Sequence, residues 1–393
     1  MRATHGRTSE CGDSLDSHRT SPLPSRFRDA ELRSSGMTTP VNDKAHEAAA
    51  IRDALDTGEI RDVLAIRASR LGDLLMTTPT LEAFRQRFDK SRITLLTNPY
   101  SAGIVQGSSS VDATIVFEGR ERDLVGHRGR KLAAGLRGKY QLLLALRPRR
   151  ELESFARRAD IGHVFPGGAQ SERRDRHVVT QCYERIAPLG LPASGPGPLR
   201  VTMSTRELDD VRSELGLWRP FVQIHPGCDE TMRIWLRRGV RRRVWPAERW
   251  IELIDTIHTR STLEVVLTSG SAVEHRINQH IAGRTLRRPK LAHRLPLRKL
   301  MSLSSLARAC ITIDTGPMHL ATAVGTQLVG LYGPSPVEYT GPWAPNGQAE
   351  VLRADLPCMP CQGKNVHCPR NVCMEEIRVH DVVACLERCA IVS

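Results

Sequence analysis

The feature that most limits the fold of this chain is a regular alternation of short apolar runs with helical segments. Apolar runs of strand length occupy residues 62–67, 92–97, 111–117 and 140–146, and helical patterns separate them. Strands that are apolar along their whole length are buried on both faces, and strands that alternate with helices pair in parallel. The pattern therefore predicts an α/β chain whose parallel sheet is covered by helices on both sides.

The same alternation begins again after a break rich in proline and glycine. Residues 192–198 hold three prolines and two glycines, a composition typical of a connection between domains. Four more strand-like runs follow, at 221–225, 263–268, 310–313 and 327–332. We therefore predict two Rossmann-like domains that face each other across a cleft. The expected boundaries are 60–200 for the first domain, 215–372 for the second, and 375–390 for a C-terminal helix.

Composition limits the partners of the chain. Lysine plus arginine (57) outnumber aspartate plus glutamate (43) among the 393 residues, which gives a formal net charge of +14. Such a charge favours anionic partners, among them phosphorylated substrates, an anionic membrane surface and nucleic acid. An aromatic content of 4% argues against base-stacking platforms. No nucleic-acid motif is present, so a nucleic-acid partner is not expected.

The N-terminal 45 residues are polar and show no periodicity, which predicts disorder. They contain no apolar leader segment, and no apolar run in the chain is long enough to cross a bilayer. The expected compartment is therefore the cytoplasm.

The first segment with chemical potential runs from Arg67 to Pro79, directly after a predicted strand. Ligands of parallel sheets bind at this carboxyl edge, and Gly72 permits a close backbone approach there. Asp73 is a candidate general base toward a substrate hydroxyl. In the alternative interpretation, Asp73 only caps the following helix. The pattern Gly-x-Gly-x-x-Gly is absent, so a nicotinamide cofactor is not favoured.

Two segments of the second half are candidates for binding an anion. His225 and Gly227 follow a strand, and Gly227 leaves backbone amides accessible, although the same residues also suit an ordinary turn. Between residues 233 and 250, seven arginines are interleaved with three tryptophans. Guanidinium groups match phosphate oxygens, but a run of charge is equally well explained as a solvated face.

The loop after the strand that ends at Ile313 is the strongest candidate site. Pro317 opens a helix there, and the amides at its start form a natural phosphate site together with the helix dipole. Asp314 and His319 are placed to hydrogen-bond ribose or sugar hydroxyls. In the alternative interpretation, Thr315 only caps the helix and His319 only packs.

Six of the ten cysteines lie near the C-terminus. Cys358 and Cys361 have the spacing of half a zinc knuckle, and Cys368 and Cys373 form a looser second half. These four are candidate ligands of a structural zinc ion. A disulfide or redox pair and reduced thiols are the alternatives.

Together these segments resemble glycosyltransferase family 9, the lipopolysaccharide heptosyltransferase family. The resemblance covers about 62–386 and rests on segments in the family's order, at 66–79, 225–227, 244–250, 314–321 and 331–335. It implies a GT-B fold whose N-terminal domain mainly binds the acceptor. The C-terminal domain would mainly bind a nucleotide-activated sugar, typically ADP-heptose. The implied reaction is inverting and requires no metal or other cofactor.

By this resemblance, Asp73 corresponds to the catalytic base, and Ser69, Arg70 and Gly72 belong to the acceptor-side loop. The implied donor-binding residues are His225, Gly227, Arg243, Glu274, Asp314, Thr315, Gly316, Pro317, Met318 and His319. Arg243 replaces a lysine or arginine that precedes Trp-Pro in the family. The arginine-rich stretch at 229–243 is longer than the family's loop, which leaves the donor sugar open. Any helix that crosses back to the first domain would be the one at about 377–389.

The expected function is transfer of heptose from a nucleotide diphosphate donor to a lipopolysaccharide-core or similar anionic, lipid-linked glycan. Its acceptor would be reached peripherally at the inner face of the cytoplasmic membrane. One alternative is a GT-B scaffold that binds glycan or nucleotide without catalysis. Another is a GT-B transferase that uses a different nucleotide sugar.

Overall fold

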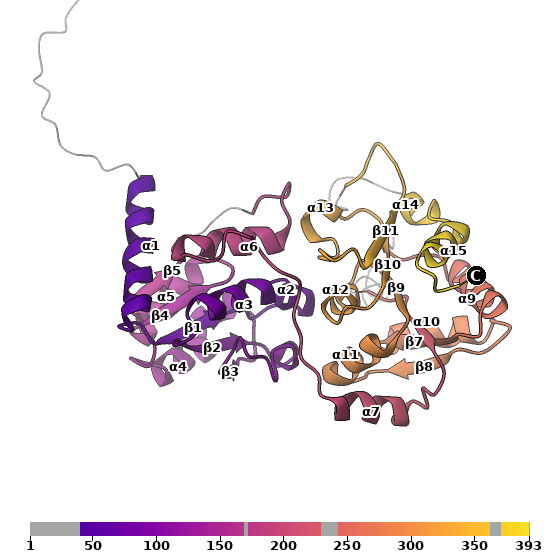
Figure 1. Cartoon of the computed structure of the whole chain (residues 1–393), viewed down its shortest axis with the longest axis horizontal. Coiled ribbons are helices and arrows are strands. Elements are labelled where there is room, and N and C mark those ends of the chain that lie inside the picture. The colour runs from indigo at the N-terminus through magenta and orange to yellow at the C-terminus, as the bar shows by residue number, and fades with distance from the viewer. Residues whose placement is uncertain (1–39, 169–171, 229–242, 362–370, 393) are drawn as a thin grey trace, which may run out of the picture. The chain divides into compact units, whose positions relative to one another are not determined.

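The computed structural model describes residues 40–168, 172–228, 243–361 and 371–392. Over this part of the chain the secondary structure forms two parallel sheets, each with helices packed against it (Figure 1). Most of the N-terminal extension, predicted as disordered, lies outside the described residues. The described part begins with helix α1 (Pro40–Thr57).

The first sheet has five parallel strands in the order β3-β2-β1-β4-β5. These are β1 (Asp62–Ile66), β2 (Arg92–Thr97), β3 (Ala113–Val116), β4 (Leu142–Ala145) and β5 (His163–Phe165). The α-helices of this half, after α1, are α2 (Leu71–Leu75), α3 (Thr78–Arg87), α4 (His127–Gly135), α5 (Arg150–Ala159) and α6 (Val178–Ile186). Short 3-10 turns are η1 (Ala102–Ile104), η2 (Glu121–Val125) and η3 (Ala187–Leu189).

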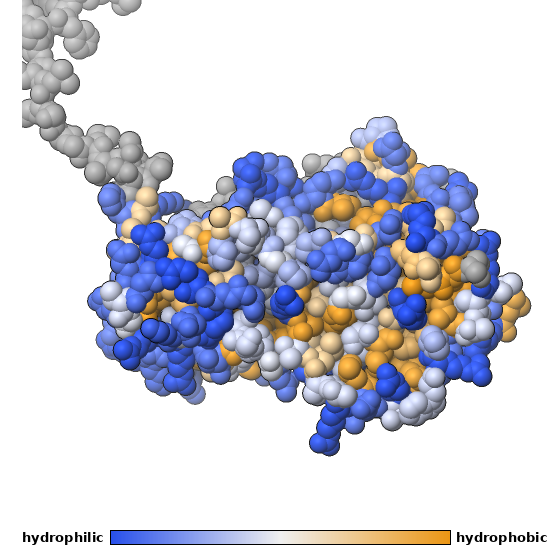
Figure 2. All heavy atoms as spheres, in the orientation of Figure 1, coloured by the Kyte–Doolittle hydropathy of each residue, from blue (hydrophilic) through white to orange (hydrophobic). Residues whose placement is uncertain are grey.

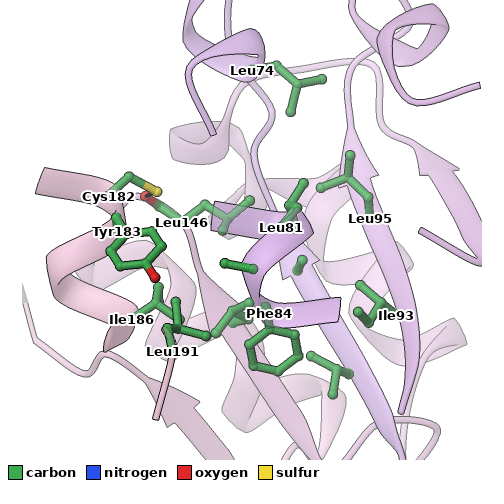
Figure 3. Close-up of a cluster of buried hydrophobic side chains, with 14 of the residues drawn as sticks. Leu74, Leu81, Phe84, Ile93, Leu95, Leu146, Cys182, Tyr183, Ile186 and Leu191 are labelled. Carbon is green, nitrogen blue, oxygen red and sulfur yellow. Dashed lines mark hydrogen bonds between the residues drawn. The ribbon is translucent and has the colours of Figure 1, made fainter. Parts of the chain in front are cut away.

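Successive residues of the central strands pack into two separate buried layers. Val63 belongs to a cluster with Phe84 of α3 and Ile186 of α6, part of which is drawn in Figure 3. Its neighbour Leu64 belongs to a different cluster, with Phe155 of α5. Because side chains of a strand alternate between faces, both faces of the sheet must be apolar. This explains why the strands are apolar along their whole length.

The second sheet has six parallel strands in the order β11-β10-β9-β6-β7-β8. These are β6 (Phe221–His225), β7 (Glu264–Ser269), β8 (Lys290–His293), β9 (Ala309–Ile313), β10 (Leu328–Tyr332) and β11 (Ala349–Arg353). The helices are α7 (Thr205–Glu214), α9 (Ala247–Arg260), α10 (Ala272–Ala282), α11 (Leu297–Leu306), α12 (Gly316–Ala323), α13 (Val337–Thr340), α14 (Val372–Glu375) and α15 (Val379–Arg388).

The last helix, α15, packs into the core of the second sheet. Val382 and Leu386 belong to the same buried cluster as Trp245 and Trp250, whose rings meet edge to face with centroids 4.7 Å apart. Nε1 of Trp245 donates to the carbonyl of Ile377, 2.9 Å away, just before α15. The chain end therefore covers the second sheet.

The predicted α/β class with two Rossmann-like halves is confirmed by the two parallel sheets. Three short strands, β5, β8 and β11, were not predicted. None of the described helices is both long enough and apolar enough to span a bilayer. On the face shown in Figure 2, hydrophilic residues cover most of the surface around the first sheet, with apolar residues between them.

Phe84 provides a test of the first core. Its ring is fully buried between α3 and the sheet, so Phe84→Ala leaves a cavity and should lower the free energy of unfolding by about 3–5 kcal/mol. Urea denaturation followed by circular dichroism measures this change. Leu286→Ala is the control, because Leu286 is 87% exposed and its loss should change stability by less than about 0.5 kcal/mol. Equal effects of the two changes would contradict the packing described.

Candidate active site

Asp73 lies in the first turn of a short helix, α2, that the sequence did not predict. The helix begins after Arg70, whose side chain makes no capping hydrogen bond, and Asp73 is its third residue. The next helix, α3, follows Thr77, again without a side-chain cap. The alternative in which Asp73 only caps the following helix is therefore wrong. Its side chain is one-third exposed and lies at the carboxyl edge of the first sheet.

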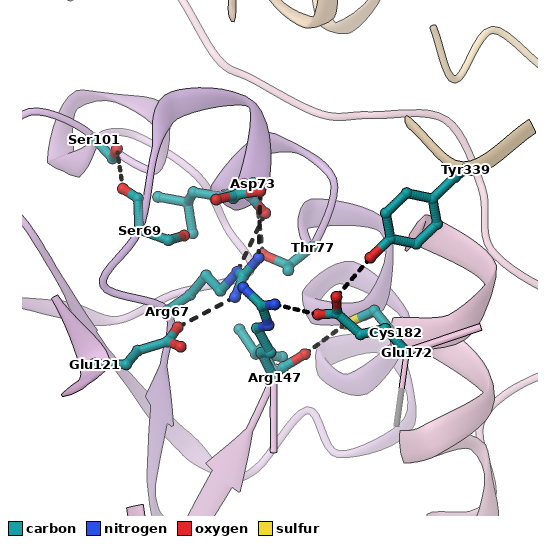
Figure 4. Close-up of polar contacts among 12 residues, drawn as sticks. Arg67, Ser69, Asp73, Thr77, Ser101, Glu121, Arg147, Glu172, Cys182 and Tyr339 are labelled. Carbon is teal, nitrogen blue, oxygen red and sulfur yellow. Dashed lines mark hydrogen bonds and ion pairs between the residues drawn. The ribbon is translucent and has the colours of Figure 1, made fainter. Parts of the chain in front are cut away.

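A buried arginine fixes the position of Asp73. Arg67, directly after β1, places Nη2 3.6 Å from Oδ1 of Asp73 and Nη1 3.2 Å from Oε1 of Glu121 (Figure 4). Arg149 contacts the other oxygen of Glu121 through Nε at 3.0 Å. Burial raises the pKa of Glu121, and the nearby arginines oppose that shift. The network holds the Asp73 carboxylate beside the positive charge of Arg67.

The other residues predicted for the acceptor-side loop shape its backbone. The carbonyl of Ser69 accepts hydrogen bonds from Asn98 and from the hydroxyl of Ser101, at 3.1 Å for the latter. Arg70 is exposed and occupies the N-cap position of α2. These contacts tie the loop after β1 to the loop after β2.

The second candidate loop follows β9. Asp314 is buried there, with Nη1 of Arg243 3.2 Å from its carbonyl oxygen and 3.4 Å from Oδ2. The hydroxyl of Ser335 donates to the same Oδ2. Thr315 occupies the N-cap position of α12, but its side chain makes no capping hydrogen bond. The arrangement puts a cation beside the start of a helix, where amides favour an anion.

Two glycines bring these loops into contact. A Cβ atom on Gly72 would lie 2.6 Å from Cδ2 of His319, and one on Gly316 would lie 3.2 Å from Cδ2 of Leu71. At Gly72 the distance is too short for any side chain unless the ring of His319 shifts, whereas at Gly316 the end of Leu71 would have to move only slightly. The N-terminal turns of α2 and α12 therefore pack directly on each other, with Asp73 inside α2 and Asp314 two residues before α12.

His319 lies between the two aspartates. Its side chain is buried, and burial lowers its pKa to about 4, although Asp314 and Asp73 both favour the protonated form. Nδ1 is buried and makes no hydrogen bond to any described residue. Pro317 and Met318 of the same helix are buried. His319 therefore fills the contact with Gly72 as a neutral ring, and its Nδ1 keeps hydrogen-bonding capacity that no described residue uses.

The loops after β6 and β7 adjoin this region on the second sheet. Nδ1 of His225 lies 2.9 Å from Oγ1 of Thr268, and burial lowers the pKa of His225. A Cβ on Gly227 would lie 2.6 Å from Oε1 of Glu274, so this glycine gives room to the carboxylate. Oε2 of Glu274 accepts the amides of Gly270 and Ser271 at 2.7 and 3.0 Å. Glu274 thus caps α10, a structural role that the sequence did not predict.

The proposed zinc site is not supported. No group of three or more His, Cys, Asp or Glu side chains within the described ranges is arranged to hold a metal ion. Cys358 and Cys361 are free cysteines, Sγ of Cys373 lies 3.8 Å from Oδ1 of Asn371, and Cys368 lies outside the described residues. The arginines at 229–242 also lie outside, so Arg243 is the first residue of that stretch that the structure places.

Sequence reasoning missed Arg67, Glu121, Arg149 and Ser335. One signal was available for Arg67, because a charged residue at the end of a fully apolar strand must find a buried partner. The partner itself, Glu121, is 54 residues away and carries no local signal.

Two parallel sheets whose glycine-containing loops meet at their carboxyl edges define a two-domain protein of the GT-B class. A sequence profile of glycosyltransferase family 9 (heptosyltransferase) matches residues 171–370. The chain belongs to this family, as the sequence predicted.

Known proteins agree with this assignment. Lipopolysaccharide heptosyltransferase 1 of Pseudomonas aeruginosa is 36% identical over 122 residues, which are 30% of this chain and 33% of that protein. The matched stretches span about a third of the length of this relative and of the Campylobacter jejuni lipooligosaccharide heptosyltransferases 2.

Solved structures share the GT-B fold. The family 9 glycosyl transferase of Veillonella parvula superposes with a TM-score of 0.69 at 21% identity, covering 84% of this chain and 97% of that one. The ADP-heptose lps heptosyltransferase II of Escherichia coli superposes with a TM-score of 0.67 at 21% identity, covering 84% and 98%. The predicted GT-B architecture is confirmed.

The contact between the loops can be tested at Gly72. In Gly72→Ala the new methyl group overlaps the buried ring of His319, and the free energy of unfolding should fall by about 1–3 kcal/mol. The matched control is Gly135→Ala in α4, where nothing lies within 4 Å of the new atom and a small gain in stability is expected. Urea denaturation compares both with the wild type, and a harmless Gly72→Ala would contradict the contact.

Protonation of His319 should make the free energy of unfolding depend on pH. Its pKa in the folded protein, about 4, is below the ordinary value of 6.5. The unfolded chain therefore binds the proton first, and the contribution of the neutral ring is complete above pH 6.5 and is lost as the pH falls toward 4. His319→Asn should reduce the slope of unfolding free energy against pH in this range by up to about 1.4 kcal/mol per pH unit. Identical slopes in urea titrations of both proteins would contradict this.

Proposed function

We propose that this protein transfers heptose from ADP-heptose to a hydroxyl of an anionic, lipid-linked glycan of the lipopolysaccharide-core type, with inversion at the sugar. The observation that carries the proposal is the packing of Gly72 against His319 and of Gly316 against Leu71. This packing places Asp73 opposite the start of α12. The names of the matched heptosyltransferases, one of them specified for ADP-heptose, support the choice of donor.

In this reaction Asp73 accepts the proton of the acceptor hydroxyl as its oxygen attacks the anomeric carbon. The bond between that carbon and the diphosphate oxygen breaks, and the electron pair leaves with the diphosphate. Arg243 and the amide of Gly316 lie where this negative charge would grow, and preorganised donors of this kind stabilise a transition state. Arg67 keeps the Asp73 carboxylate oriented toward the acceptor.

A cavity that a chain of ion pairs joins to Asp73 is a suitable place for the acceptor. It has a volume of about 430 Å³ and is lined by four arginines and two glutamates, namely Arg147, Arg149, Arg150, Arg185, Glu151 and Glu172, together with Pro148. Arg149 also contacts Glu121, which links the cavity to Arg67 and Asp73. The surplus of guanidinium groups fits a phosphate or carboxylate on the acceptor. Acceptors of this kind at a membrane surface would also be attracted by the net positive charge.

Asp73→Asn tests the catalytic assignment. The amide cannot accept the hydroxyl proton, so turnover should fall by at least about a hundredfold while the affinity for the donor is unchanged. Turnover is measured as ADP release from ADP-heptose in the presence of lipopolysaccharide-core acceptor, and affinity by calorimetry with ADP. Asp209→Asn, an exposed aspartate on α7 paired with Arg212, is the control and should keep full activity.

Full turnover in Asp73→Asn would exclude Asp73 as the base. Tight ADP binding by the wild type without any transfer would favour the alternative of a binding protein. Transfer from UDP- or GDP-sugars in preference to ADP-heptose would retain the reaction class and correct the donor.

A further inference from the structure

The segment 335–339 makes one polar contact with the loop of Asp314 and another with the arginine-lined cavity. At one end, the Ser335 hydroxyl donates to Oδ2 of Asp314. Four residues later, the hydroxyl of Tyr339 in α13 donates to Oε2 of Glu172 at 2.7 Å. The other oxygen of Glu172 forms an ion pair with Arg147 (Figure 4). The second sheet's helix α13 is therefore joined to a wall of the acceptor cavity.

The carboxylate of Glu172 pairs with Arg147 inside that cavity, where an anionic ligand would otherwise bind. Burial alone would raise its pKa, but the hydrogen bond from Tyr339 and the charge of Arg147 outweigh burial and lower the pKa. Glu172 is therefore ionised at neutral pH and partly neutralises Arg147. Its side chain is about one-third exposed, so it can turn outward into solvent without a change of fold.

We propose that Glu172 is a placeholder for the anionic group of the acceptor, and that Tyr339 couples its displacement to the donor loop. This inference rests on the proposed function, because it takes the cavity as the acceptor site. An acceptor phosphate or carboxylate competes with Glu172 for Arg147. When Glu172 turns away from Arg147, the hydroxyl of Tyr339 loses the carboxylate that accepts its hydrogen bond.

The donor acts on the opposite end of the same segment. Sugar or ribose hydroxyls that bind Asp314 compete with Ser335 for its carboxylate. Ser335 is joined to α13 through Pro336 alone, and the carbonyl of Thr340 at the end of α13 accepts a hydrogen bond from Tyr332 of β10. Each ligand therefore breaks one of the connected contacts. The ligand that binds second has fewer contacts left to break, so each ligand lowers the Kd of the other.

A purely structural role for the Tyr339–Glu172 bond makes a different prediction. In that case its removal lowers stability and weakens or leaves unchanged the binding of each ligand. If the bond instead holds Glu172 in place over Arg147, its removal strengthens the binding of an acceptor-side anion taken alone. Removal of the bond also abolishes the coupling between the two ligands.

Calorimetry on the full chain separates these cases. ADP is the donor-side probe and glucose 6-phosphate, a sugar with one anionic group, is the acceptor-side probe. In the wild type, saturating glucose 6-phosphate should lower the Kd of ADP by about fivefold or more. In Tyr339→Phe the Kd of ADP should be nearly the same with and without glucose 6-phosphate. Glucose 6-phosphate alone should bind this variant several-fold more tightly than it binds the wild type. Glu172→Gln, which weakens the pair with Arg147, should act in the same direction.

Two controls locate the effects. Glu338→Gln changes a neighbour of Tyr339 on α13 that pairs with Arg353, and it should behave as the wild type. Arg185→Gln should abolish binding of glucose 6-phosphate and keep binding of ADP, which places that probe in the cavity.

An unchanged Kd for glucose 6-phosphate in both Tyr339→Phe and Glu172→Gln would overturn the inference. Equal coupling in Tyr339→Phe and the wild type, or glucose 6-phosphate binding that survives Arg185→Gln, would also overturn it. Failure of the wild type to bind ADP contradicts the proposed function instead, because the experiments with glucose 6-phosphate alone still test the displacement of Glu172.

Discussion

The absence of a side chain at Gly72 is the constraint on which the site depends. The ring of His319 fills the space that any other residue would need, and Leu71 lies against Gly316. Asp73 follows the first glycine directly and Asp314 precedes the second by two residues, so this contact sets the separation of the two carboxylates. A buried, neutral His319 between them supplies hydrogen-bonding capacity without adding charge.

Arginine has a second role in this protein besides making it basic. Arg67 and Arg147 each hold a carboxylate at the carboxyl edge of the first sheet, and Arg243 holds one at the edge of the second. Removing one partner of such a pair would leave an uncompensated charge in a poorly hydrated place, which is costly. The part of the net charge that the structure places near the site is thus organised into pairs and is poorly described as a solvated face.

Much of the fold was predictable because the central strands are buried on both faces, so their apolar runs are continuous. β5, β8 and β11 were missed because they are short and only partly buried, with polar residues such as His163 and Lys290. Helix α2 was missed because Gly72 lowers helix propensity. At the site, glycines and aspartates beside strand ends gave a local signal. Pairs such as Arg67–Glu121 and Tyr339–Glu172 join residues far apart in sequence, and only the folded chain brings them together.

The bond from Trp245 to the carbonyl of Ile377 has a consequence for biosynthesis. Trp245 stands two residues after Arg243, and its pocket is closed by α15, which lies more than 130 residues further along the chain. A nascent polypeptide that has emerged from the ribosome only as far as β11 therefore lacks the support that positions Arg243. The pair of Arg243 with Asp314 would gain this support late in translation, when the last helix reaches the sheet.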